Sequence, residues 1–140
     1  MSVEYAHEEI VEPPRSWWRA MRAGLACKCP ACGRGSIFTS YLKVADTCPA
    51  CGEELHHHRA DDAPAYMVIF IVGHIVVPLM LWIEVAYQPA MWIHAVVWAP
   101  IIIAMSLALL PPVKGALVGL QWGLRMHGFG GENEEDKFAA

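Results

Sequence analysis

Two long apolar stretches dominate the second half of the chain. The first covers residues 65–86, the second covers residues 91–110, and only residues 87–90 connect them. A helix rises about 1.5 Å per residue, so each stretch is long enough to cross the ~30 Å hydrocarbon layer of a bilayer. Because so short a connection forces consecutive helices to run antiparallel, the sequence predicts a membrane α-helical protein with a two-span transmembrane hairpin over residues 63–110.

The ends of the hairpin carry signals that support these limits. Asp61 and Asp62 precede the first span, and Pro64 falls in its first turn, where a missing backbone N–H is tolerated. Trp82 and Trp92 flank the connection, as aromatic side chains do at a membrane–water interface. We therefore expect the first helix to begin close to residue 63.

Beyond the second span, a pair of prolines and an amphipathic stretch predict a separate helix over residues 111–127. Gly115, Gly119 and Gly123 recur at a spacing of four residues on one side, and Lys114 and Arg125 lie on another. Small residues at this spacing suit a helix that lies at the cytoplasmic membrane surface or packs closely on another helix. Glycines that are merely tolerated in an interfacial helix would give the same pattern.

The region before the metal-binding motif predicts one short helix between less ordered segments. Ser16 is a suitable N-cap for a helix over residues 17–25, in which Trp17 and Leu25 are apolar and Arg19 is basic. This segment, residues 15–26, is expected either to lie at the headgroup interface or to pack on the metal-binding module. Residues 1–14 and the acidic residues 128–140 are expected to be disordered tails.

A repeated motif within residues 27–60 predicts a metal site. The unit Cys-Pro-Ala-Cys-Gly occurs at 29–33 and again at 48–52, with fifteen residues between Cys32 and Cys48. We call each unit a knuckle. This spacing indicates four-thiolate coordination by Cys29, Cys32, Cys48 and Cys51. All-sulfur tetrahedral ligation suits zinc, with a rubredoxin-type iron as the alternative. A closed zinc site is structural by default, so we expect an N-terminal zinc ribbon.

Two neighbouring features have open roles. Cys27, two residues before the first knuckle, is a bystander, a thiol that exchanges into the site, or a reactive thiolate. His56, His57 and His58 could bind a second metal, but adjacent histidines on an extended chain point in different directions and form a poor chelate. We favour a structural role for the histidine run.

Ionisable side chains within the spans are costly and therefore informative. Glu84 and His94 are each five residues from the centre of the connection, so they lie at the same depth and are predicted to form a hydrogen bond across the hairpin. His74 lies near the bilayer midplane, one turn before Pro78, and only Ser106 is near it on the opposite helix. We predict that His74 faces a partner. A haem held by His74 and His94 of one chain is disfavoured, because their depths differ by about 15 Å.

Charge predicts the orientation of the hairpin. Hydrophobic residues make up 56% of the chain, and the charged residues are unevenly placed. Seven of the ten Lys and Arg residues precede the first span, and none lies in the connection. The positive-inside rule then places both termini and the ribbon in the cytoplasm, where cysteines bind metal rather than form disulfides. Few basic residues surround the knuckles, so nucleic-acid binding is not expected.

The combined motifs resemble one known family. Residues 29–38, 42–52, 57–66 and 68–78 are similar in order and spacing to the DUF983 family of small bacterial zinc-ribbon membrane proteins. The resemblance implies a two-span, multi-pass protein of the bacterial inner (plasma) membrane. It also implies an association with genes for aa3-type cytochrome c oxidase and its assembly factors, and it supplies no catalytic residues.

These features favour a non-catalytic protein. The sequence has no nucleophile–base pair and no phosphate-binding glycine loop, and two spans are too few to enclose a substrate path. The leading hypothesis is an accessory or assembly factor, or a small subunit, of a respiratory terminal oxidase. It would bind a larger membrane complex through its spans. The alternative is a homo-oligomeric metal- or haem-handling protein that uses His74, His94 and the histidines at 56–58 as ligands.

Overall fold

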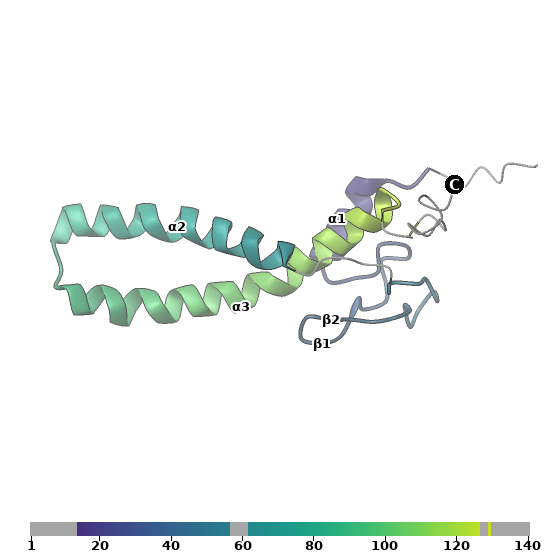
Figure 1. Ribbon diagram of the computed structural model, residues 1–140, viewed down its shortest axis with the longest axis horizontal. Helices are drawn as coiled ribbons and strands as arrows, with labels where there is room; N and C mark the ends of the chain where they lie inside the picture. The colour runs from purple at the N-terminus through teal and green to yellow at the C-terminus, as the bar shows by residue number, and fades with distance from the viewer. Residues whose placement is uncertain (1–13, 57–61, 127–128, 130–140) are drawn as a thin grey trace, which may run out of the picture.

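The computed structural model describes residues 14–56, 62–126 and 129. Its elements are the helix α1 (Trp17–Leu25), the strands β1 (Phe38–Ser40) and β2 (Lys43–Val44), and the long helices α2 (Ala63–Tyr87) and α3 (Met91–Gly123). Figure 1 shows α2 and α3 side by side at one end of an elongated molecule. The last part of α3 continues to the other end, where α1 and the two strands gather around it.

The predicted helical hairpin is present, and both of its helices are long and apolar enough to cross a membrane. Its sharp connection uses Gln88 in a left-handed conformation (φ 45°), and the Gln88 amide donates to the Glu84 carbonyl oxygen at 3.0 Å. At the other end Pro64 lies in the first turn of α2, as predicted. The Asp62 side chain makes no capping hydrogen bond, so it can act on the start of α2 only through its charge.

A narrow seam of buried residues joins α2 to α3. Val68, Val72 and Val76, one helical turn apart on α2, pack with Trp98 and Val113 of α3. Most other large apolar side chains of the two helices face outward, for example Ile69 (68% exposed) and Ile103 (59% exposed). So extensive an apolar surface indicates contact with lipid or with another protein rather than with water.

The helix of the second predicted span does not stop at residue 110, because α3 runs continuously through Pro111 and Pro112. Proline has no backbone N–H, so Pro111 cannot donate to the Leu107 carbonyl one turn earlier. The Tyr41 hydroxyl supplies the missing donor and bonds the Leu107 oxygen at 2.6 Å. The helix changes direction in its yellow-green part instead of stopping (Figure 1). The separate helix predicted over 111–127 is thus the last part of α3.

The glycine face of α3 packs against α1. Added Cβ atoms would collide backbone to backbone, Gly115 with Gly24 and Gly119 with Ala20, and a Cβ on Gly123 would lie 2.6 Å from the Trp17 Cα. The two helices therefore run antiparallel in direct contact. Of the roles left open by the sequence, close packing on another helix is the one observed, and the glycines are required by it.

The helix α1 covers the predicted range, and the Ser16 hydroxyl accepts from the Arg19 amide at 3.4 Å as its N-cap. It packs on α3, and its Arg19 and Ala23 also line a pocket together with residues of the first knuckle. Trp17 and Trp18 remain about half exposed. Its predicted position at the lipid headgroups stays a prediction.

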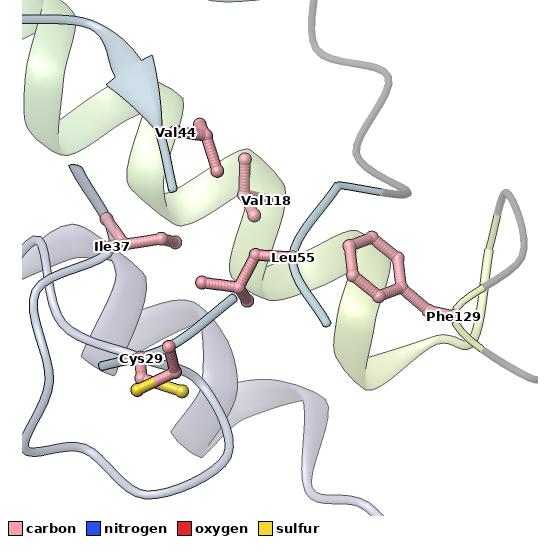
Figure 2. Close-up of a cluster of buried hydrophobic side chains, with 7 residues drawn as sticks. Cys29, Ile37, Val44, Leu55, Val118 and Phe129 are labelled. Carbon is pink, nitrogen blue, oxygen red and sulfur yellow. The ribbon is translucent and has the colours of Figure 1, made fainter. Parts of the chain in front are cut away.

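The metal-binding region packs on a second face of the same part of α3. Val118 of α3 is fully buried among Cys29, Ile37, Val44 and Leu55 of this region, as Figure 2 shows. Phe129, which the sequence placed in the acidic tail, is also buried in this cluster. The remaining tail residues, 1–13, 128 and 130–140, lie outside the described residues, and so do His57, His58 and Asp61. The predictions made for them stay predictions.

Candidate metal centre

The two knuckles fold in the same way. In each, the glycine amide donates to the carbonyl of the first cysteine, Gly33 to Cys29 at 2.8 Å and Gly52 to Cys48 at 2.9 Å. Both glycines have positive φ, +68° and +74°, a conformation that side chains disfavour. Short antiparallel bridges, Lys28 with Ser36 and Thr47 with Glu54, close the base of each knuckle.

This repeated turn directs four sulfur atoms toward one point. The Sγ atoms of Cys29, Cys32, Cys48 and Cys51 all lie within 4.8 Å of one another. The Cys29–Cys51 and Cys32–Cys48 pairs are 3.7 and 3.8 Å apart. In a tetrahedral zinc site with Zn–S bonds of about 2.3 Å, sulfur atoms are about 3.8 Å apart. The sulfur positions therefore fit a single ion such as zinc, and none of these cysteines forms a disulfide.

Backbone amides and burial act on the thiols in opposite directions. The Gly35 and Arg34 amides lower the pKa of Cys32 to about 6, because they bond its thiolate. Burial raises the pKa of Cys29 to about 12, and burial also raises the pKa of Cys51. A divalent cation would offset the cost of burying these thiolates, and Zn²⁺ would hold all four deprotonated.

Several contacts position the two knuckles. Gly35 lies against the second knuckle, so that an added Cβ would collide with the Cys48 sulfur. The Trp122 indole N–H of α3 donates to the carboxylate of Glu53, directly after the second knuckle, at 2.9 Å. The Arg15 guanidinium lies over the Trp122 ring, 4.4 Å from its centroid. These contacts, which the sequence did not reveal, hold the metal-binding region against α3.

A pocket of about 480 Å³ opens beside the first knuckle. Arg15, Ser16 and Arg19 from the start of α1 line one side, and Pro30, Cys32 and Gly33 line the other. The four cysteines would take every position of a tetrahedral ion, so a ligand in this pocket would find no free coordination site.

Cys27 is not part of the sulfur cluster. It is half-buried, with a left-handed backbone (φ 60°), and its carbonyl accepts from the Ile37 amide at 3.1 Å. Burial raises the pKa of its thiol, which is the opposite of what a reactive thiolate requires. The structure thus favours the bystander role for Cys27.

In the hairpin, the predicted hydrogen bond between Glu84 and His94 is present. The His94 Nε2 and Glu84 Oε2 atoms are 2.8 Å apart, and the Trp98 indole N–H donates to His94 Nδ1 at 3.2 Å. Because Nδ1 accepts from Trp98, Nε2 carries the proton and donates to Glu84. Both ring nitrogens of His94 therefore have partners within the chain.

His74 is exposed on α2 and has a partner that the sequence did not reveal. Its Nδ1 lies 2.8 Å from the Phe70 carbonyl oxygen, one turn earlier on the same helix. A carbonyl only accepts, so Nδ1 is the donor, and Nε2 is left with a lone pair. Ser106 is not its partner. The partner-facing role of His74 stays a prediction. Such a partner would have to donate a hydrogen bond to the Nε2 atom or bind its lone pair as a metal ion does.

Comparisons with known proteins agree with the family resemblance. No curated protein and no solved structure matches the chain. The family model described as "Protein of unknown function (DUF983)" matches residues 38–122, from β1 almost to the end of α3. The match includes the second knuckle and covers more than half of the 140 residues. On this evidence the chain belongs to the DUF983 family.

Proposed function

We propose that the chain is a non-catalytic zinc-ribbon protein of the bacterial inner membrane. This proposal rests on the closed cluster of four cysteine sulfurs. The cluster packs on α3, the helix that forms half of the apolar hairpin. A site with four protein ligands leaves no position for a substrate or an activated water, so its metal stabilises the fold. The ribbon is then a cytoplasmic platform on a membrane anchor.

The apolar outer surface of α2 and α3 supports insertion into a bilayer. The basic residues before α2 support a cytoplasmic position for both termini. Reporter fusions test this orientation: fusions at residues 30 and 135 should be active only with a cytoplasmic reporter, and a fusion at residue 89 only with a periplasmic one. The opposite result at residue 30 or 135 would overturn the orientation.

We further propose that the protein is an accessory or assembly factor, or a small subunit, of a respiratory terminal oxidase. Two helices joined by a narrow seam enclose no substrate path, and they leave most of their apolar surface available to a larger membrane complex. The oxidase in particular is supported by the gene association that the family resemblance implies.

Affinity purification of the full chain in mild detergent tests this role. We expect subunits of a haem–copper oxidase to co-elute with the wild-type chain and with Cys27→Ser. They should be lost or reduced with Cys48→Ser, which removes a metal ligand. A wild-type chain that elutes alone, or only with copies of itself, would contradict an oxidase partner.

One observation favours the alternative, a homo-oligomeric metal- or haem-handling protein. His74 donates through Nδ1 to a backbone carbonyl and leaves Nε2 available, the arrangement common among metal-ligating histidines. His94 does not fit this role, because both of its ring nitrogens are engaged. A haem absorbance band in the purified wild-type protein that disappears in His74→Leu would support the alternative. A spectrum without that band would exclude haem.

A further inference from the structure

The tip of the β1–β2 hairpin touches α3 where two prolines remove helical hydrogen bonds. The Tyr41 hydroxyl donates to the Leu107 carbonyl oxygen at 2.6 Å, and the Lys114 ammonium donates to the Leu42 carbonyl oxygen at 2.6 Å. Each side therefore gives one donor and one acceptor. We call these four residues the latch.

The latch lies where α3 is weakest. Pro111 and Pro112 remove two consecutive helical hydrogen bonds, those to the carbonyls of Leu107 and Ala108. On one face of α3 the residues Leu107, Pro111 and Lys114 follow one another at helical spacing, so the tip contacts the helix on both sides of the two prolines. In a bilayer the Leu107 carbonyl would have no water to bond, which makes the Tyr41 donor more important.

The tip depends on the metal for its position. Tyr41 and Leu42 belong to the segment between Cys32 and Cys48, so both ends of that segment are fixed at the sulfur cluster. Strands of three and two residues are too short to be stable by themselves. The two strands are anchored by Ile37, directly before β1, and by Val44 at the end of β2. Both side chains pack in one cluster with Cys29 and Val118 (Figure 2).

We propose that metal binding by the ribbon closes the latch and thereby fixes α3 across its double proline. Loss of the metal frees the tip. The part of α3 after Pro112 can then bend relative to the helical hairpin, with Pro111 and Pro112 as the hinge. Whether the ribbon holds a metal thus determines the conformation of α3 at the cytoplasmic end of the helical hairpin. This inference rests on the proposed zinc ribbon, and it adds a conformational consequence of metal loading.

Hydrogen exchange of the full-length protein in lipid nanodiscs tests the latch, with zinc content measured on each sample. In the zinc-loaded state, Tyr41→Phe should keep its zinc while the amides of residues 113–116 exchange about three- to tenfold faster, as expected for the loss of one hydrogen bond. Lys114→Met should have the same effect. Tyr87→Phe is the matched control, because Tyr87 is exposed at the last residue of α2, at the opposite end of the helical hairpin from the latch, and it should exchange as the wild type does.

Chelation provides the decisive comparison. Without metal the latch is already open, so wild type and Tyr41→Phe should exchange at the same fast rate in residues 113–116. The latch would be refuted if wild-type exchange there were equal with and without zinc, or if Tyr41→Phe were equally faster in both states. A wild-type chain that binds neither zinc nor iron would instead refute the zinc ribbon itself, and the latch with it.

Discussion

Gly24 of α1 and Gly115 of α3 pack backbone against backbone, so that a Cβ added to either would collide with the carbonyl oxygen of the other. The same antiparallel contact continues one turn away, between Ala20 and Gly119. Close shape complementarity thus holds α1 in place and leaves Trp17 exposed. The packing surface of α1 is used inside the protein, and its exposed aromatic side remains available for lipid.

Gly115→Ala should therefore destabilise the packing of α1 on α3 by about 1–3 kcal/mol, because the new methyl group would collide with the Gly24 backbone. Gly73→Ala is the control: Gly73 is also helical, but a Cβ there meets nothing within 4 Å. That change should be neutral or stabilise by up to about 1 kcal/mol. Chemical unfolding in mild detergent measures both. Equal effects would show that the α1–α3 contact is not tight.

Metal content should depend on the four clustered cysteines and not on the fifth. Wild type and Cys27→Ser should each carry one zinc per chain, because Cys27 lies outside the sulfur cluster. Cys48→Ser should lose the zinc and unfold the ribbon, since binding energy is most of the folding energy of so small a module. Metal analysis and circular dichroism measure these changes. A zinc-free Cys27→Ser would place Cys27 among the ligands.

Zinc affinity should rise steeply with pH. Burial raises the pKa of Cys29 to about 12 and also raises that of Cys51, so both thiols are protonated in the metal-free ribbon at pH 7. Zinc binding then releases at least two protons, and the apparent affinity should rise about a hundredfold from pH 7 to pH 8.

Below pH 6 the dependence should become steeper, because Cys32, with a pKa of about 6, then gains a proton as well. Competition with a chromophoric chelator across this range measures the slope. An affinity independent of pH would mean that the thiols are already ionised without metal.

The sequence predicted the features that depend on spacing along the chain. The two knuckles follow from their identical motifs, and the Glu84–His94 hydrogen bond follows from equal distances to the connection. The continuity of α3 could not be predicted in this way. Prolines normally end a helix, and here that local rule is overridden by Tyr41, a donor 66 residues away in the sequence.

The candidate sites show the same limit. The glycine spacing on α3 predicted a close contact, but only the folded chain shows that its partner is α1. For His74 the sequence pointed only to side-chain partners, whereas the Nδ1 atom bonds a carbonyl of its own helix. Contacts with backbone atoms leave no trace in residue identity, so they were overlooked.

His74 should stabilise a complex with another membrane protein through its Nε2 lone pair. A polar atom that faces lipid has no water to bond, so a donor on a partner helix would satisfy it. Hydrogen bonds between membrane helices contribute about 0.6–1.7 kcal/mol, so His74→Leu should weaken the complex about three- to twentyfold. Zinc content and membrane insertion should not change. Quantitative co-purification in mild detergent measures the effect.

Two further variants make the His74 test specific. Ile75→Leu changes the next exposed position on α2 without changing polarity, and it should co-purify with partners at wild-type yield. His74→Gln keeps an acceptor at this depth and should recover part of the loss, because a partner donor can still be bonded. If His74→Leu retains the same partners at wild-type yield, the Phe70 carbonyl is sufficient for His74, and the interface lies elsewhere on the hairpin.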